Sequence, residues 1–315
     1  MTFEERRLAS PSGADLAIYH MPATTPVRGL LLVNHGVAEH GRRYLNFAVS
    51  MAAQGLAVYV HDHRGHGATR SPAHLQGRFA PDGGLDAVLE DVAAVRNWAA
   101  SDHPGLPIIL FGHSMGGLVA LNAAERDPGL YDGLAVWNAN FHPGLAGRFG
   151  QGVLAVERML KGSDVPSPIL ARLTFGAWAR SIAERRTDFD WLSHDPMEVD
   201  RYVADPLCGF DVTVSLWIEL FRMSYAGATL DRLRRLPPDM PVNLVGGGED
   251  PATENGKAVS WLQTRMKKAG LRQVTATIYP GARHDTLNDT VRARAEQAFS
   301  AWCRSVVERS RGAPD

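Results

Sequence analysis

The chain has 315 residues, of which 45% are hydrophobic and 21% are charged. This length and composition are typical of a folded soluble protein with a large core, and they exclude a disordered or fibrous chain. The 33 basic and 34 acidic side chains leave a formal net charge of -1, so no overall positive field favours a nucleic acid partner.

The N-terminal segment 1–10, MTFEERRLAS, contains no apolar stretch of the kind found in signal peptides. The apolar run at 29–33 is far shorter than the roughly 20 residues that a membrane helix needs. We therefore expect a cytoplasmic protein.

Six short apolar runs are predicted to form strands that are buried on both faces, because polar residues do not alternate along them. They lie at 29–36, 56–62, 107–114, 133–138, 241–247 and 274–281. Helical patterns lie between and after them, at 44–54, 84–100, 116–126, 255–269 and 291–307. The alternation of strand and helix predicts an α/β fold with a mostly parallel central sheet flanked by helices.

The segment between the strands at 133 and 241 is too long to be a simple connection. It carries amphipathic helical stretches at 152–160 and 215–225. We therefore predict a helical cap inserted at 141–237, and a core domain made of residues 1–140 and 238–315.

Ser114 is the predicted nucleophile. It lies in Gly112-His113-Ser114-Met115-Gly116, a GxSxG motif that follows a buried strand and opens a helix. This context is the one that a nucleophile elbow requires, and the glycines allow the strand and the helix to approach closely. The alternative is a tight turn in which the serine only caps the helix.

A serine hydroxyl needs a base, and imidazole has a suitable pKa. In α/β hydrolases the acid and then the base follow the nucleophile along the chain, each after a late strand. This order predicts Asp250 as the acid and His284 as the base, with Glu249 and then Asp285 as alternative acids. Asp250 also precedes Pro251, so it could instead be a plain helix N-cap.

The tetrahedral intermediate of acyl transfer needs backbone N–H groups that stabilise its oxyanion. One is expected from Met115, the residue after the nucleophile, and the other from the loop after the strand at 29–36. We assign the second to Val37, because Gly36 allows the backbone to turn and aim the next amide inward.

Four motifs occur in an order that resembles monoacylglycerol lipases and related lysophospholipase-like serine hydrolases, of the serine aminopeptidase S33 type. They are NHGVAEHGRRY at 34–44, HDHRGHGAT at 61–69, GHSMGG at 112–117 and YPGARH at 279–284. The resemblance covers about residues 14–300 and includes YVADPL at 202–207. It implies the α/β-hydrolase fold and a Ser-His-Asp triad.

The resemblance further implies that Glu39, Arg43 and Tyr202 line the polar end of the ester site, near a glycerol-like leaving group. Gly36 and His113 are assigned to the same substrate-binding site. The chain departs from some monoacylglycerol lipases, which carry a second histidine three residues beyond the catalytic one, where this chain has Leu287.

The predicted function is hydrolysis of monoacylglycerol-like or other lipid esters through an acyl-enzyme, with no metal and no cofactor. Lysophospholipids, short-chain or aryl esters, lactones and amides stay open as substrates, as does transfer to an alcohol other than water. A noncatalytic ligand receptor on the same fold is a further alternative.

The HxHxxH pattern of His61, His63 and His66 could also be read as part of a metallo-hydrolase site. That interpretation leaves the Ser114 motif unexplained, and a polar loop with turn glycines explains the histidines. Cys208 and Cys303 form no CxxC pair, so we expect buried free thiols.

Aromatic side chains in the predicted cap offer apolar area for an acyl chain, although they could equally be the core of the cap itself. They are Trp178, Phe189, Trp191 and Trp217. The sequence leaves open the acyl length, the oligomeric state and whether the cap makes transient contact with membranes or micelles.

Overall fold

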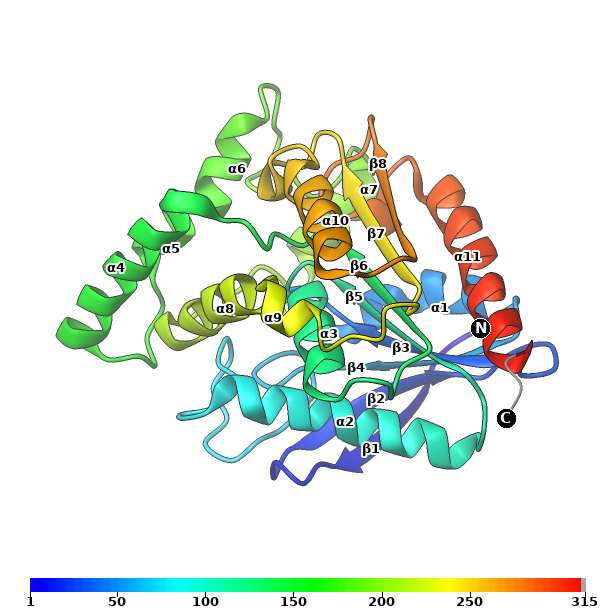
Figure 1. Cartoon of the computed structure of the whole chain (residues 1–315). Coiled ribbons are helices and arrows are strands. Elements are labelled where there is room, and N and C mark those ends of the chain that lie inside the picture. Colours follow the sequence, from blue (N-terminus) through cyan, green and yellow to red (C-terminus); the bar gives the residue numbers. More distant parts are fainter. Residues whose placement is uncertain (313–315) are drawn as a thin grey trace.

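A computed structural model describes residues 1–312, in which eight strands form one sheet in the order β1-β2-β4-β3-β5-β6-β7-β8 (Figure 1). The strands are β1 (Glu4–Ala9), β2 (Asp15–Met21), β3 (Gly29–Asn34), β4 (Leu56–His61), β5 (Ile108–His113), β6 (Gly133–Trp137), β7 (Val242–Gly247) and β8 (Val274–Tyr279). All neighbours from β4 to β8 are parallel, whereas β1 and β2 are antiparallel to their neighbours. The predicted mostly parallel sheet is confirmed.

Two features of the sheet differ from the prediction. The antiparallel strands β1 and β2 were not predicted. β8 was predicted to be buried on both faces, and this is wrong, because its Thr275 and Thr277 are exposed. As the last strand of the sheet, β8 leaves one of its faces partly uncovered.

Helices cover both faces of the sheet (Figure 1). One face carries α2 (Gly84–Asp102), α3 (Met115–Arg126) and α10 (Lys257–Ala269), whose apolar residues pack on the sheet as one cluster. The other face carries α1 (Leu45–Ala52) and α11 (Arg292–Gly312), with Phe47, Met51 and Phe299 among the buried contacts. The sheet is therefore the middle layer between two helical layers.

Helices also make up most of the insertion between β6 and β7. They are α4 (Gly144–Lys161), α5 (Pro168–Leu173), α6 (Phe175–Ser181), α7 (Pro196–Ala204), α8 (Val214–Gly227) and α9 (Leu230–Leu233). Three of these helices, α5, α7 and α8, have a capping side chain at the N-terminus. Ser167, Asp195 and Thr213 each accept a hydrogen bond from an amide in the first turn of the helix that follows.

The insertion is joined to the core through α8. Trp217 and Leu220 of α8 belong to the same apolar cluster as Leu118 of α3, and the side chain of Asn122 donates to the carbonyl of Met223. The Nε atom of Arg232 in α9 also lies 2.9 Å from the carboxyl group of the buried Glu125. The boundaries 141 and 237 of the predicted cap stay a prediction.

No helix within residues 1–312 combines the length and the apolar character needed to cross a bilayer.

Candidate active site

The turn from β5 into α3 places Ser114 at the carboxyl end of the central strands. Ser114 has φ 54° and ψ -119°, a strained conformation for a residue with a side chain. A Cβ atom on Gly112 would lie 2.0 Å from the carbonyl oxygen of Gly116, and one on Gly116 would lie 2.0 Å from that of Asn34. Only glycine at both positions allows this tight turn.

Ser114, His284 and Asp250 lie in one hydrogen-bonded chain, although they are far apart in the sequence. The Nε2 atom of His284 is 2.9 Å from the Oγ atom of Ser114, and its Nδ1 atom is 2.9 and 3.0 Å from the two carboxylate oxygens of Asp250. The three residues follow β5, β8 and β7, which are parallel, so their side chains meet at one edge of the sheet.

The Asp250 carboxylate is fully buried and accepts further hydrogen bonds. Its donors are Thr253 Oγ1 at 2.8 Å, Ala252 N at 2.9 Å and Asn138 Nδ2 at 3.2 Å. Burial raises the pKa of Asp250, but the charge of His284 and these donors outweigh it and hold that pKa below its ordinary value. The carboxylate is therefore ionised and can hold the Nδ1 proton of His284.

The two alternative acids lie elsewhere. Glu249 is half exposed and contacts His194 Nε2 at 3.0 Å. Asp285 contacts Arg43 Nη2 at 2.8 Å and Asn288 Nδ2 at 2.9 Å. Neither carboxylate makes a hydrogen bond to His284, whose Nδ1 atom contacts Asp250 instead.

Val37 and Met115 both line the cavity beside Ser114. The amide of Val37 makes no hydrogen bond to another group of residues 1–312. The amide of Met115 lies at the first position of α3, where a helix provides no acceptor. The two amides predicted for the oxyanion therefore have no hydrogen-bond acceptor in the described part of the chain, and their residues line the same cavity as Ser114.

Glu39 is buried, and its carboxylate is occupied by neighbouring groups. Oε1 accepts from Gly36 N at 2.5 Å and from Tyr44 Oη at 2.9 Å, and Oε2 accepts from Arg43 Nε at 2.9 Å. Burial raises the pKa of Glu39, but His113 and Arg43 lower it well below the ordinary value. The amide of Gly36, a predicted substrate-binding residue, is thus bonded to Glu39.

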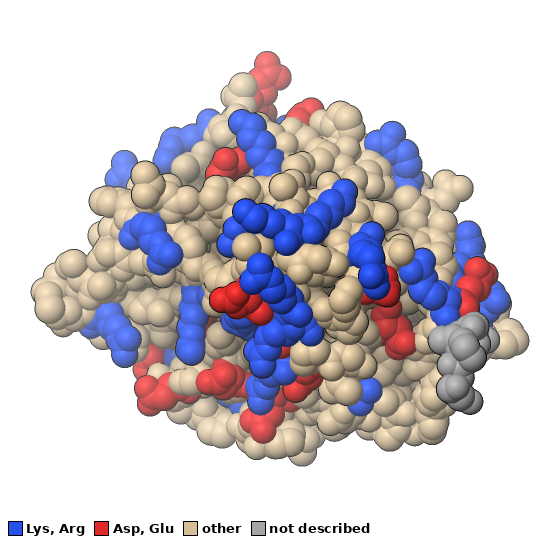
Figure 2. Space-filling view, in the orientation of Figure 1, with Lys and Arg blue, Asp and Glu red and all other residues tan. Residues whose placement is uncertain are grey.

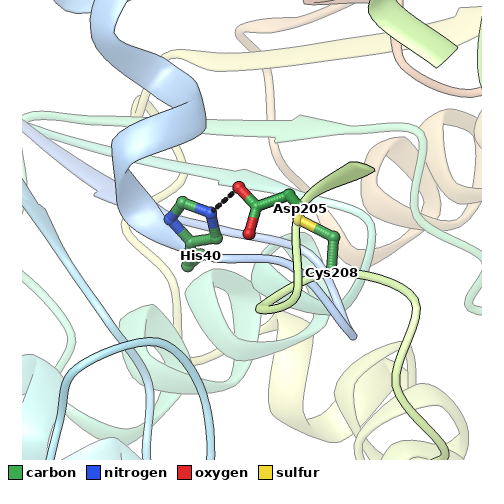
Figure 3. A group of neighbouring side chains, drawn as sticks. All are labelled: His40, Asp205 and Cys208. Atoms are coloured by element: carbon green, nitrogen blue, oxygen red, sulfur yellow. Dashed lines mark hydrogen bonds and ion pairs between the residues drawn. The ribbon is translucent and has the colours of Figure 1, made fainter. Parts of the chain in front are cut away.

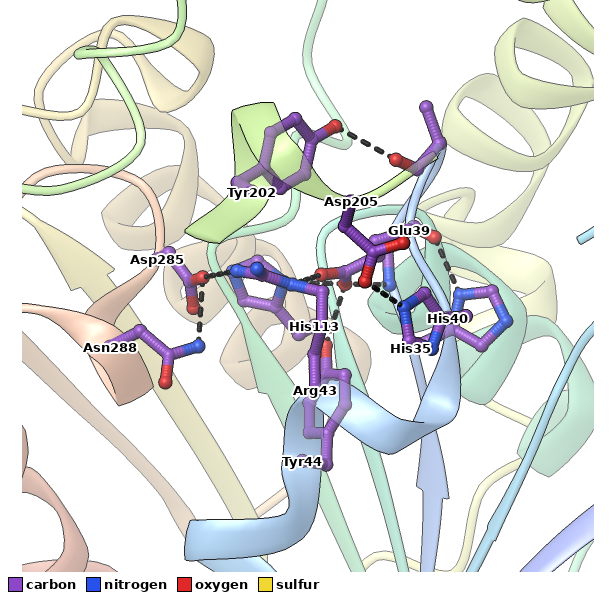
Figure 4. A network of polar contacts seen from close by, with 12 residues as sticks. His35, Glu39, His40, Arg43, Tyr44, His113, Tyr202, Asp205, Asp285 and Asn288 are labelled. Carbon is purple, nitrogen blue, oxygen red and sulfur yellow. Dashed lines mark hydrogen bonds and ion pairs between the residues drawn. The ribbon is translucent and has the colours of Figure 1, made fainter. Parts of the chain in front are cut away.

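A network of alternating charges surrounds Glu39 (Figure 4). Arg43 bridges Glu39 and Asp285, and the Nδ1 atom of His113 lies 3.7 Å from Glu39. Burial lowers the pKa of His113, but Glu39 and Asp285 raise it to about 9, so this imidazole is charged at neutral pH. Its Nε2 atom then donates to the carbonyl of His284 at 3.0 Å.

A cavity of about 410 Å³ extends from Ser114 between the sheet edge and the inserted helices. Glu39, Arg43, His113, Tyr202 and Asp285 border it on the polar side. Its apolar lining includes all four aromatic residues predicted to contact an acyl chain, which are Trp178, Phe189, Trp191 and Trp217. Leu287, by contrast, is buried in the core cluster on the α1 and α11 face and does not line the cavity.

The histidines of the HxHxxH pattern are buried next to one another. The ring centroids of His61 and His63 are 4.7 Å apart, and His35 lies 4.5 Å from His63 and 5.2 Å from His66. Burial lowers the pKa of His61 and of His66 to about 3. Their nitrogens do not meet at a common point that could hold a metal, as far as residues 1–312 are concerned.

His40, Asp205 and Cys208 are the group of potential ligands that does converge in the described residues (Figure 3). His40 Nε2 is hydrogen-bonded to Asp205 Oδ2 at 2.9 Å, and the other Asp205 oxygen accepts from Leu207 N at 2.9 Å. Burial raises the pKa of the Cys208 thiol, which disfavours the thiolate that metals bind. The group is explained by contacts between the insertion and the core.

Several residues that shape the site were not singled out from the sequence. Asn138 and Thr253 bond Asp250, and their positions after β6 and β7 are the only sequence signal of this role. The segment 191–193 of the insertion holds the loop of His284, because Trp191 O accepts from His284 N and Leu192 O accepts from Asp285 N. No motif marks those backbone contacts.

The family model of serine aminopeptidase, S33, matches residues 25–291. A monoacylglycerol lipase of Mycolicibacterium smegmatis is 27% identical over 96% of this chain and 97% of its own length. A human monoglyceride lipase is 30% identical over 84% of this chain and 78% of its own length. The crystal structure of a carboxyl esterase from Bacillus coagulans in complex with glycerol matches with a TM-score of 0.87 and 25% identity, over 98% of this chain and 99% of that one.

Proposed function

Because the chain belongs to the serine aminopeptidase S33 family of α/β hydrolases and is a carboxylic ester hydrolase, we propose that Ser114, His284 and Asp250 are its catalytic triad and that its substrates are monoacylglycerol-like lipid esters. The single observation that carries the triad is the hydrogen-bonded chain from the Ser114 hydroxyl through His284 to the buried Asp250 carboxylate.

In the proposed mechanism, Ser114 Oγ attacks the ester carbonyl carbon while His284 Nε2 takes the hydroxyl proton. The imidazolium that forms is stabilised by Asp250, which also holds the correct tautomer. The negative carbonyl oxygen of the tetrahedral intermediate accepts hydrogen bonds from the amides of Val37 and Met115.

Collapse of this intermediate breaks the bond to the alcohol, which receives its proton from His284, and leaves the acyl group on Ser114. A water molecule then gives a proton to the same histidine and attacks the acyl-enzyme. The second tetrahedral intermediate uses the same two amides, and its collapse releases the carboxylic acid and restores the serine.

The shape and the lining of the cavity support a lipid ester as the substrate. The aromatic side chains of the insertion provide an apolar wall for an acyl chain, and the charged network lies on the polar side of the same cavity. There Arg43 Nη1 has no acceptor among residues 1–312, so it can donate to a hydroxyl of a glycerol-like leaving group.

The polar side of the cavity carries no excess positive charge that would attract a phosphate in the leaving group. The carboxylates of Glu39 and Asp285 balance the charges of Arg43 and His113, so an uncharged glycerol fits this side without the desolvation cost that the phosphate of a lysophospholipid would meet. Monoacylglycerol-like esters are therefore favoured over lysophospholipids.

The test is a hydrolysis panel in which acyl length and head group are varied separately, with Ser114→Ala as the control enzyme. We expect kcat/KM for a long-chain monoacylglycerol to exceed that for the lysophospholipid of equal acyl length by at least about tenfold. Equal rates on the two head groups would contradict the proposed substrate class. Wild-type turnover by Ser114→Ala would contradict the triad.

We also propose that the insertion makes transient contact with lipid surfaces through α4 and α5. Both helices expose large apolar side chains, which are Leu145, Phe149, Val156, Met159, Leu160, Ile169 and Leu173. The left-hand end of the molecule in Figure 2, where Figure 1 shows α4, is mostly free of charged side chains. An apolar patch at the mouth of a lipid-ester site provides a contact to the phase in which the substrate resides.

A further inference from the structure

Ala38 lies in an unfavourable backbone conformation next to the proposed oxyanion amide of Val37. Its φ is 54°, in the left-handed region that residues with a Cβ rarely adopt. Such a conformation persists only where surrounding contacts hold it, because it costs free energy. The loop of Val37 and Ala38 must therefore be held in place by other parts of the molecule.

Hydrogen bonds from the insertion hold the loop of Val37 and Ala38 in place. The carbonyl oxygen of Ala38 accepts hydrogen bonds from Tyr202 Oη at 2.8 Å and from Gly209 N at 2.9 Å. The same tyrosine oxygen lies 3.1 Å from Gly209 N, so the three groups form one closed set of contacts. Figure 4 shows the hydroxyl of Tyr202, on the green helix of the insertion, pointing at a carbonyl of the blue loop.

Tyr202 is itself immobilised. Its ring is buried, with the Arg43 guanidinium 4.9 Å from the ring centroid on one side and the Phe189 ring at 5.1 Å. Three residues further on, Asp205 forms its 2.9 Å contact with His40, which follows Glu39 on the core side. Burial raises the pKa of Tyr202, so its hydroxyl keeps the proton that it donates.

The Tyr202 hydroxyl has both a hydrogen-bond acceptor and a donor within the protein, so it needs no substrate as a partner. The Tyr202 oxygen donates to Ala38 O and accepts from Gly209 N, although the ring borders the cavity. A role as a ligand of the leaving group would require the hydroxyl to give up the bond that holds Ala38.

We propose that Tyr202 is a positioning residue that acts from the insertion, through the Ala38 carbonyl, to hold the Val37 amide in the orientation that stabilises the oxyanion. This inference rests on the proposed function only in naming the oxyanion as the group that the amide serves. It makes the insertion a structural part of the oxyanion site as well as a wall of the cavity.

The first test is Tyr202→Phe, which keeps the ring and its packing and removes the hydroxyl. Loss of an oxyanion donor itself costs about 10²- to 10³-fold in kcat, so a displaced donor is expected to cost less, about tenfold. We expect kcat on a p-nitrophenyl ester to fall by about tenfold, KM to stay within about twofold, and affinity for a boronic acid transition-state analogue to fall by the same factor as kcat. A rise in KM with unchanged kcat would overturn the proposal and indicate a substrate ligand.

The second test is rescue by Ala38→Gly. Glycine adopts a positive φ without a steric penalty, so the loop keeps its conformation with less help from the tyrosine. In the Ala38→Gly background we expect Tyr202→Phe to lower kcat by less than about threefold. An equal loss of kcat in both backgrounds would overturn the proposal.

The matched control is Tyr225→Phe, which removes another tyrosine-to-carbonyl hydrogen bond within the insertion, to Gly144 O at 2.7 Å. Tyr225 does not line the cavity, and kcat is expected to stay within about twofold of wild type.

Hydrogen exchange separates this proposal from the proposed function, because it needs no turnover. In Tyr202→Phe, and not in Tyr225→Phe, the amides of the peptide covering 35–41 are expected to exchange at least about fivefold faster, measured by mass spectrometry. Unchanged exchange would overturn the proposed positioning role of Tyr202 even in an active enzyme. Faster exchange in a protein that hydrolyses no ester would support the positioning role of Tyr202 and contradict only the proposed function.

Discussion

Asp250 performs two tasks with one carboxylate. It accepts a hydrogen bond from the amide of Ala252, as the N-cap of the short helix that Pro251 begins, and it accepts another from the Nδ1–H group of His284. The two interpretations considered from the sequence, helix cap and catalytic acid, are therefore compatible in geometry. The cap contact also helps to fix the direction in which the carboxylate faces the imidazole.

Replacement of Asp250 by Asn is expected to lower kcat by about 10⁴-fold, because an amide at this place favours the wrong imidazole tautomer. The control is Glu249→Gln, which changes the neighbouring carboxylate that contacts His194, and for which we expect kcat within about twofold of wild type. Steady-state kinetics on a p-nitrophenyl ester checks both variants. A mild defect in Asp250→Asn together with a severe one in Glu249→Gln would contradict the assignment.

The buried histidines in and directly after β4 make folding sensitive to acid. Both ring nitrogens of His61 are buried without a hydrogen-bond partner, and burial lowers its pKa to about 3. The unfolded chain binds a proton at this position below about pH 6.5, and the folded chain does so only near pH 3. The free energy of unfolding therefore falls as the pH drops through this range.

Removal of the His61 imidazole should make the free energy of unfolding less dependent on pH. Between pH 6.5 and 4.5 a single such histidine accounts for about 2 kcal/mol of lost stability. We expect the loss measured by urea unfolding to be smaller by about this amount in His61→Phe, whereas His74→Phe, at an exposed position, should match wild type. If the free energy of unfolding of His61→Phe depends on pH as strongly as that of wild type, the expectation is contradicted, because His61 would then bind its proton equally well in the folded and unfolded states.

At the scale of helices and strands, the proposed lipid contact of α4 is testable with soluble variants. Met159 and Leu160 are 78% and 76% exposed and do not line the cavity. Their double replacement by Glu is expected to reduce sedimentation with phosphatidylcholine vesicles at least fivefold, since each apolar side chain contributes about 1.5 to 3 kcal/mol when fully buried. Turnover of a soluble short-chain ester should stay within about twofold.

The control for this experiment is the double replacement of Met197 and Val203 by Glu. Both residues are exposed on α7, outside the α4 and α5 patch. Equal vesicle binding by both double variants and wild type would contradict a docking role for α4.

The strands that carry the site could be predicted from the sequence because their apolar runs are buried in the middle of a parallel sheet. β3, β4, β5, β6 and β7 are buried at every position. β1 could not be recognised in this way, because four of its six residues are charged and it lies exposed at an edge. The Ser12-Gly13 turn before β2, with Gly13 at φ 84°, was the available signal of a hairpin.

At the scale of the whole molecule, the position of the candidate site follows from topology. Residues after parallel strands meet at one edge, so Ser114, Asp250 and His284 could be predicted to lie together. What the insertion contributes could not be predicted, because Trp191 and Leu192 hold the His284 loop through backbone carbonyls, and the side chain of Tyr202 reaches Ala38 across 164 residues of sequence. Such contacts depend on the packed arrangement and leave no local pattern.

Labelling by a fluorophosphonate probe tests the central proposal most directly, because the probe reacts only with an activated serine. We expect one label per chain on the peptide that contains Ser114, no label in Ser114→Ala, and labelling of His284→Ala slowed by at least about 100-fold. Stoichiometric labelling at another serine, or ester turnover by an unlabelled Ser114→Ala variant at the wild-type rate, would contradict it.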